Sequence, residues 1–430
     1  MATATGTKKK TYKKGRSYKK KDYGPSRADI MAAEIEEEIL KFWREMMESS
    51  PQGVQRPWVL NVTRAERAGA YLKDGSRIPY QGSFNQWLIA YATKDYTSEL
   101  APLVISQGQL CEALGVKKFY ETEACQAGVR SNMALYRPNI RQQYVLSNGM
   151  PWEAPDGARR RPTQQEIDQY GLRSREVCTG FGTSAAYSMA DLYPYLPADL
   201  KIKIDMLAEA RRGKGREINP EDSFETFIEG YVQDMIDRQG IKHEFSNNRA
   251  FYSPGDDAIT LPHSVQFVNP LEYLSTVAHE LAHSTMHLNG RLPIVKGDPI
   301  GYAIEEVIAE TTAAMVVKSM ENDLPEEFRN RDDVKKMFED YYTNSHNYVR
   351  DYGSKTEFLK MVDRLEDIHR QEAEDKTKNT LRSVMTQITA AVTTLEKKIE
   401  PSTRLEKKEA NIEALKRKIR ERRNDPGLSN

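Results

Sequence analysis

The sequence has few cysteines, no long apolar run and no net charge. Its three cysteines, Cys111, Cys125 and Cys178, show no CxxC spacing and no even count, which indicates a reducing compartment. No apolar run approaches the length of a transmembrane helix, and no apolar segment follows the basic N-terminus as it does in a secretory signal. We therefore expect a soluble protein of the cytoplasm that has no membrane partner.

The zero net charge conceals an uneven distribution. Residues 8–21 carry nine basic side chains and no acidic one, so acidic residues are in excess over the rest of the chain. Because this segment has no apolar period, we expect residues 1–26 to form a disordered basic tail. Such a tail attracts polyanions by releasing counterions, although it could equally serve only to keep the protein in solution.

Histidine is also scarce, yet two of the seven frame the sequence His279-Glu280-Leu281-Ala282-His283. Residues four apart on a helix share a face, so both imidazoles can bind one metal ion. Glu280 would then point toward a metal-bound water and take its proton. The alternative is a polar helix whose two histidines only pack or face solvent. The pattern predicts His279 and His283 as metal ligands and Glu280 as the catalytic residue.

A zinc site of this kind needs a third protein ligand. Residues 302–310 have helical spacing and contain Glu305, Glu306 and Glu310. Glu306 and Glu310 share a face, whereas Glu305 points about 100° away from Glu306. We therefore predict Glu306 as the third ligand and Glu310 as the acceptor of a ligand histidine's outer N–H. Glu305 is expected on a solvated face. Two histidines with one glutamate favour Zn²⁺.

His287 lies eight residues after His279, near the same stripe of a straight helix. It could contact a substrate or compete as a ligand, but a half-exposed position at the end of the helix is the favoured interpretation. The longer zinc signature that ends in a third histidine is not met.

The order of elements after residue 200 is typical of a zincin domain. A helical pattern precedes strand candidates at 241–245, 249–252 and 258–261, and the metal helix and a second helix follow. We expect the strand at 259–261 to form the sheet edge on which an extended peptide substrate lies.

The remaining parts of the chain complete an α+β organisation. Helices are predicted at 28–47, 84–91 and 106–114, and polar loops at 127–180. After residue 370 a charged heptad-like pattern, interrupted at 400–402, predicts a helical hairpin or short coiled coil through which chains could self-associate. The predicted units are a tail (1–26), a small α+β DNA-binding domain (27–195), a zincin-like domain (200–370) and a helical extension (371–430).

The chain resembles the ArdC-type antirestriction proteins of plasmids and phages. Those proteins pair an N-terminal single-stranded-DNA-binding domain with a zincin-like metallopeptidase domain. The resemblance is carried by residues 250–262, 273–283 and 302–310, and more loosely by 79–85, 106–115 and 187–192. Residues 346–349 also resemble a later family segment, which implies that His346 or Tyr348 contacts the substrate or its oxyanion.

The resemblance implies single-strand binding, which needs a cationic groove and aromatic platforms. Each contributor could instead lie in the core or face solvent. The plausible contributors are Arg56, Trp58, Arg64, Tyr80, Trp87 and Arg130.

These observations together predict a protein that binds single-stranded DNA, contains a zinc metallopeptidase site and protects mobile-element DNA from host defence. One alternative is a zinc protease that cleaves a protein or peptide substrate associated with DNA. Another is a DNA-coating or virion protein in which the metal only stabilises the fold.

Overall fold

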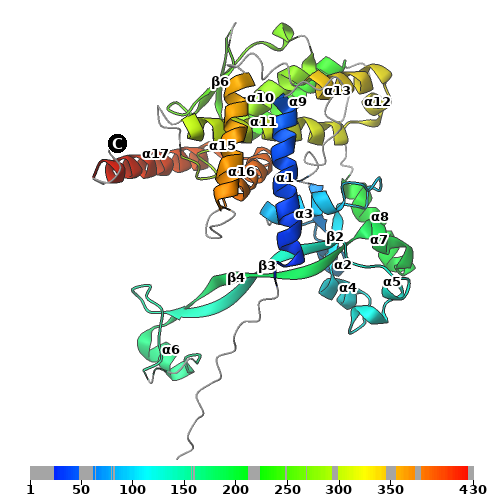
Figure 1. Cartoon of the computed structure of the whole chain (residues 1–430), viewed down its shortest axis with the longest axis vertical. Helices are drawn as coiled ribbons and strands as arrows, with labels where there is room; N and C mark the ends of the chain where they lie inside the picture. Colours follow the sequence, from blue (N-terminus) through cyan, green and yellow to red (C-terminus); the bar gives the residue numbers. More distant parts are fainter. Residues whose placement is uncertain are drawn as a thin grey trace, which may run out of the picture.

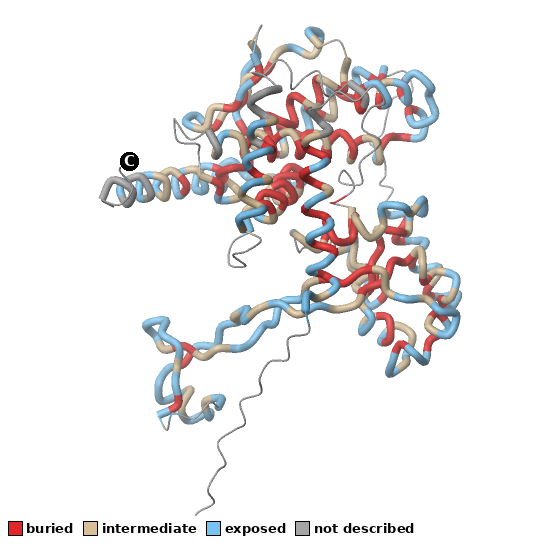
Figure 2. Tube along the Cα trace, viewed as in Figure 1, coloured by how far each residue is buried: buried red, intermediate tan, exposed pale blue. Residues whose placement is uncertain are grey.

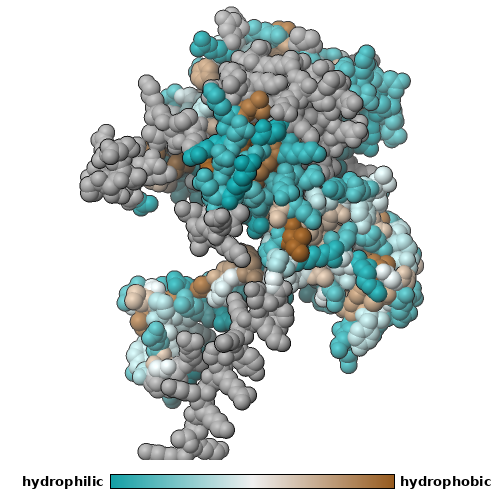
Figure 3. All heavy atoms as spheres, viewed as in Figure 1, coloured by the Kyte–Doolittle hydropathy of each residue, from teal (hydrophilic) through white to brown (hydrophobic). Residues whose placement is uncertain are grey.

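The computed structural model has an α+β fold, as predicted, with helices around two separate sheets (Figure 1). None of the helices in the described ranges combines the length and apolar character that crossing a bilayer requires. In Figure 3 the coloured part of the visible face is largely hydrophilic, with small separate hydrophobic patches. The structure describes residues 24–47, 62, 64–78, 80, 83–155, 157, 160–211, 223–246, 249–267, 269–292, 299–344, 355–372 and 379–424.

The N-terminal part of the chain forms a four-stranded sheet of order β1-β2-β4-β3 with short helices around it. Strands β1 and β2 are parallel, and the other pairs are antiparallel. The elements are α1 (Arg27–Met47), β1 (Glu66–Arg67), α2 (Ala68–Asp74), α3 (Ser83–Ala92), β2 (Leu103–Ser106), α4 (Gln107–Ala113), η2 (Phe119–Glu121), α5 (Glu123–Gln126), β3 (Met133–Val145), α6 (Gln164–Tyr170), β4 (Arg173–Ser188), α7 (Met189–Leu192), η3 (Tyr193–Tyr195) and α8 (Ala198–Arg211).

Local sequence signals explain where these helices begin and which face they bury. Helix α4 starts at a capping box, in which the Ser106 hydroxyl accepts a hydrogen bond from the Gln109 backbone N–H. Helix α1 buries Ile35, Ile39 and Trp43, which lie on one helical face. The predicted helices at 28–47, 84–91 and 106–114 correspond to α1, α3 and α4.

Strands β3 and β4 form a long antiparallel ribbon that leaves the body of the molecule and ends near α6 (Figures 1 and 2). We predicted polar loops for residues 127–180, and the ribbon corrects that prediction. Beyond Tyr136 most of its residues are exposed on both faces, so the sequence has no alternation of apolar and polar residues to indicate strands.

The C-terminal part contains a three-stranded sheet of order β5-β7-β6, with β7 parallel to β5 and antiparallel to β6. The elements are α9 (Phe224–Gln239), β5 (Lys242–Phe245), β6 (Phe251–Ser253), β7 (Ala258–Leu261), η4 (Ser264–Gln266), α10 (Pro270–Ser284), α11 (Pro299–Asn322), α12 (Glu326–Arg329), α13 (Asp332–Asn344), α15 (Lys355–Glu372), α16 (Thr380–Leu395) and α17 (Pro401–Asn424).

The sheet order shows that the prediction of a sheet edge at residues 259–261 was wrong. Residues 259–261 belong to β7, which pairs with a strand on each side and has no free edge. The edge strands of this sheet are β5 and β6.

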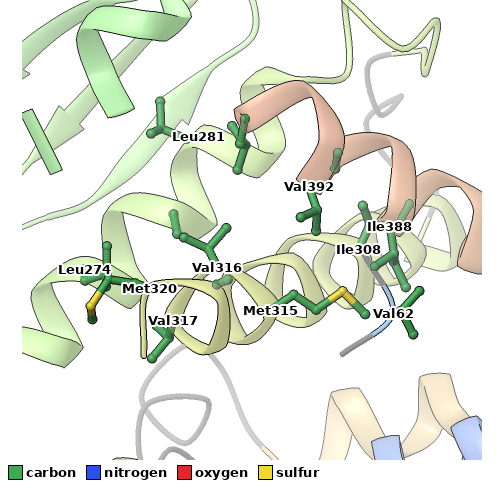
Figure 4. Close-up of a cluster of buried hydrophobic side chains, with 14 of the residues drawn as sticks. Val62, Leu274, Leu281, Ile308, Met315, Val316, Val317, Met320, Ile388 and Val392 are labelled. Carbon is green, nitrogen blue, oxygen red and sulfur yellow. The ribbon is translucent and has the colours of Figure 1, made fainter. Parts of the chain in front are cut away.

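Helices α10, α11 and α16 pack together around a continuous apolar core (Figure 4). Leu281 of α10, Ile308 of α11 and Ile388 of α16 are buried in it. The same core includes Trp43 and Trp87 from the N-terminal part. We predicted that α16 belongs to a separate charged extension, whereas the structure uses its apolar face to join the two parts of the chain.

Substitutions in α16 and α17 test this role. Ile388→Ala should lower the free energy of unfolding by about 2–5 kcal/mol, because it removes a buried side chain from a packed core. Leu405→Ala, in the exposed part of α17, should change it by no more than about 0.5 kcal/mol. Urea denaturation measures both values. Equal, small effects would show that α16 is an appendage rather than part of the core.

Candidate metal centre

The predicted metal motif lies on α10, and the predicted acidic ligand lies on α11. Helix α10 begins with Asn269, whose side chain accepts a hydrogen bond from the Leu271 backbone N–H, and has Pro270 in its first turn. Helix α11 packs along α10 through apolar side chains (Figure 4). This packing holds the polar faces of the two helices together at a partly buried position.

Three side chains converge there. The Nε2 atoms of His279 and His283 are 3.0 Å apart. Oxygens of Glu306 lie 3.5 Å from Nε2 of His279 and 3.7 Å from Nε2 of His283. One ligand atom from each residue lies within 4.8 Å of the others, which is compatible with one ion about 2.0–2.2 Å from each donor. Two imidazoles and a carboxylate at this spacing fit a divalent metal ion.

A carboxylate also lies next to the outer nitrogen of each imidazole. Nδ1 of His279 is 3.2 Å from Oε1 of Glu310, the arrangement that the sequence predicts. Nδ1 of His283 is 3.3 Å from Oε1 of Glu305. A carboxylate at Nδ1 fixes the tautomer that leaves Nε2 free to bind a metal, and it orients the ring. Both imidazoles are therefore held in a ligand-competent orientation.

Glu305 was predicted on a solvated face, and the structure corrects this. It is buried, and the Arg291 guanidinium donates to both of its carboxylate oxygens at 2.9 and 3.0 Å. Burial would raise the pKa of Glu305, but the His283 hydrogen bond and the Arg291 charge outweigh it and lower the pKa to about 2. Arg291 also donates to the carbonyl of Ala282 on α10. The Arg291–Glu305 salt bridge thus links α11 to the end of α10, beside His283.

Glu280 is buried beside the ligands. Burial raises the pKa of its carboxyl group, and the two imidazoles and a hydrogen bond from the Tyr252 backbone N–H lower it in part. Burial also disfavours protonation of His279, but Glu310 and the other nearby carboxylates dominate and raise its pKa to about 10. The His279 imidazole therefore lies among negative charges, which favours a cation at this position.

His287 is neither half-exposed nor near the ligands, because α10 ends at Ser284 and the chain turns. It is buried, its Nε2 is 3.2 Å from the Pro254 carbonyl oxygen, and the Asn411 amide donates to its Nδ1 at 3.1 Å. Because Nδ1 accepts this hydrogen bond, the neutral ring carries its proton on Nε2, which donates to the Pro254 carbonyl. Burial lowers the pKa of His287. Neither nitrogen is available to a metal.

Helix α17 contacts the end of the metal helix through a buried arginine. The Arg404 guanidinium pairs with both oxygens of Asp257 at 2.8 and 2.9 Å and donates to the Ser284 carbonyl at the end of α10. Asp257 also accepts a hydrogen bond from the Tyr252 hydroxyl. This contact was not expected, because the charged C-terminal helix was predicted to present a solvated face.

The residues predicted to bind DNA have different environments. Trp87 is fully buried and its Nε1 donates to Thr389, so the prediction that it stacks on a base is wrong. Arg64 lines a cavity of about 670 Å³, and Tyr80 is partly buried, with the Arg67 guanidinium 5.2 Å from its ring centroid. Arg130 is exposed beside α5. Four predicted site residues lie outside the described residues: Arg56, Trp58, His346 and Tyr348.

Glu305→Gln tests the role of this carboxylate in metal binding. The substitution should weaken metal affinity about 10- to 100-fold, because it removes the charge that orients His283. Competition with a chromogenic chelator measures the affinity, and thermal unfolding shows whether the variant is folded. Glu327→Gln, an exposed change of the same kind on α12, should leave affinity unchanged. Equal affinities for the two variants would contradict the role assigned to Glu305.

Three comparisons relate this chain to known proteins. A family model described as a zincin-like metallopeptidase matches residues 231–338, which include the motif and Glu306. A segment of 75 residues is 44% identical to the DNA primase TraC of Escherichia coli and covers 17% of this chain and 5% of that protein.

Two crystal structures of the antirestriction protein ArdC from plasmid R388 also match. The metal-free structure has 15% identity and a TM-score of 0.41, over 84% of this chain and 95% of that one. The Mn(II)-bound structure has 14% identity and a TM-score of 0.39, over 85% and 96%. Residues 231–338 therefore contain a zincin-like metallopeptidase domain.

Proposed function

We propose that this protein binds single-stranded DNA, protects mobile-element DNA from host restriction and contains a zinc-dependent peptidase site. The observation that supports the peptidase site best is the convergence of His279, His283 and Glu306 next to the buried Glu280. Structural zinc sites are usually closed by four protein ligands. Among the described residues only three ligands meet here, which leaves room for a reacting group.

His279, His283 and Glu306 would hold the metal. We favour Zn²⁺ because two imidazoles and a carboxylate are a common catalytic zinc set. The Mn(II)-bound ArdC structure makes Mn²⁺ the alternative to test. The metal would supply Lewis acidity that polarises the scissile carbonyl and makes water more acidic.

Glu280 would act as general base and then general acid. A carboxyl group is most effective in this role when its pKa lies near the working pH, and burial raises the pKa of Glu280 in that direction. Its carboxylate would accept a proton from the attacking water and deliver it to the leaving amine. The hydrogen bond from the Tyr252 backbone N–H would keep the carboxylate oriented.

The peptide would lie along β6 rather than β7. Strand β6 is an edge strand of the sheet, and Tyr252 within it contacts Glu280. An extended peptide can add to such an edge through backbone hydrogen bonds. This placement brings the peptide backbone next to the general base.

The DNA-binding part of the proposal rests on charge and on the relatives. Residues 8–21 carry nine basic side chains, and the relatives are named as an antirestriction protein and a DNA primase. The DNA would be that of a phage or plasmid in the host cytoplasm. The exposed part of α17, with Leu405 on its surface, remains the proposed site of self-association.

Two alternatives remain testable. In one, the protein is chiefly a zinc protease that cleaves DNA-associated proteins. In the other, it coats DNA or enters the virion, and the metal only stabilises the fold. The two alternatives predict different results. Only the DNA-coating protein would still protect DNA after the general base Glu280 is removed.

Glu280→Gln separates the peptidase from a structural metal. It should reduce hydrolysis of labelled casein or of proteins bound to single-stranded DNA on the order of 10²- to 10⁴-fold, the usual effect of losing a general base. Metal content by elemental analysis and DNA affinity should not change, and Glu327→Gln is the matched control. Undiminished protection of unmodified plasmid DNA in a restricting host would exclude the peptidase as the protective activity.

DNA affinity across a salt series tests the single-strand proposal. We expect the full chain to bind a single-stranded oligonucleotide more tightly than a duplex of equal length at each salt concentration. Removal of residues 1–26 should reduce the salt dependence, because fewer counterions are released, and should retain the preference for single strands. Fluorescence anisotropy measures both. Binding that requires the tail and does not distinguish the two DNA forms would reject the proposal.

A further inference from the structure

The ribbon formed by β3 and β4 has one face that differs in charge from the other. Cross-strand pairing places Arg141 opposite Val177, Gln143 opposite Arg175 and Val145 opposite Arg173. Residues paired across an antiparallel ribbon, and those two positions along each strand, point to the same face. These six residues therefore share one face, called here the arginine face.

Three arginines lie along this face at regular intervals. Arg141, Arg175 and Arg173 occupy successive levels of the ribbon, about 7 Å apart at two residues per level. All three are exposed. The Arg175 guanidinium donates to the Gln143 side chain at 2.9 and 3.1 Å, which confirms that the two share the face.

The positive charge on this face is not neutralised locally. Within the described part of the chain, no ion pair involves Arg141, Arg173 or Arg175. The nearest acid in the ladder, Glu176, pairs with Gln142 and therefore lies on the opposite face. Isolated exposed arginines are ordinary, but a row of three on one face without a carboxylate is an electrostatic match for a polyanion.

The shape of the ribbon and the composition of the face indicate which polyanion. Single-strand sites combine cations with aromatic platforms for the bases, and the arginine face carries no aromatic residue. Tyr144 pairs with Ser174 and lies on the opposite face. A two-stranded ribbon fits the major groove of B-DNA, which is about 12 Å wide. The ribbon also extends away from the body of the protein, where a duplex can reach it (Figures 1 and 2).

We propose that the arginine face of the β3–β4 ribbon binds the phosphate backbone of duplex DNA at a groove. This is a second DNA surface, separate from the single-strand binding proposed above, and it does not depend on that binding or on the metal centre. A protein with both surfaces would be suited to a junction between single- and double-stranded DNA.

The triple variant Arg141→Gln, Arg173→Gln and Arg175→Gln tests this inference in the full-length protein. Fluorescence anisotropy with a labelled 30-base-pair duplex measures the affinity at several salt concentrations. The slope of log affinity against log salt concentration should be smaller in magnitude by about 3, because three phosphate contacts are lost. Duplex affinity at 0.1 M salt should fall about 100-fold. Affinity for a single-stranded 30-mer should change less than about threefold, as expected for a site elsewhere.

The matched control is Lys335→Gln, Lys336→Gln and Arg370→Gln, which removes the same charge from exposed positions on α13 and α15. It should leave the duplex slope unchanged. Equal losses of duplex affinity in the two triple variants would show that only net charge matters and would overturn the inference. An unchanged duplex affinity in the ribbon variant, or an equal fall in its affinity for single strands, would also overturn it.

A measurement on the unaltered protein covers the case in which the variant fails to fold. Bound duplex should protect Arg141, Arg173 and Arg175 from modification by phenylglyoxal, read by mass spectrometry, whereas the single strand should not. Full modification of these arginines under saturating duplex would reject the ribbon as the contact surface.

Discussion

The structure depends on how buried negative charge is balanced around two imidazoles. Four carboxylates crowd His279 and His283, and one guanidinium, from Arg291, offsets them in part. Such a concentration of like charge at buried and partly buried positions is costly unless a cation balances it. The packing of α10, α11 and α16 buries apolar surface, and the free energy of this burial holds these groups together. The four carboxylates belong to Glu280, Glu305, Glu306 and Glu310.

The convergence of His279, His283 and Glu306 could be predicted because its information is local. Two histidines four apart and two glutamates four apart need only the period of a helix to be placed. Glu305 and His287 were misjudged because their environments depend on distant partners. Arg291 neutralises Glu305, and Asn411, on a helix more than 100 residues away, bonds to His287. A helical wheel does not contain that information.

The fold class and most helices followed from the sequence, but the neighbours of each element did not. The order of strands places β7 at the centre of its sheet, and short apolar strands do not reveal that order. As sequence, the apolar stripe of α16 is compatible with a coiled coil or a core, and Trp87 with a base platform or a core; the structure buries both. The ribbon was missed because both of its faces are polar, so the period-2 pattern of a half-buried strand is absent.

The bond between Arg404 and the carbonyl of Ser284 links residues 120 positions apart. During synthesis on a ribosome, α10 and α11 leave the exit tunnel well before α17 does. A nascent chain therefore has all three proposed metal ligands before it has the side chain that secures the end of α10.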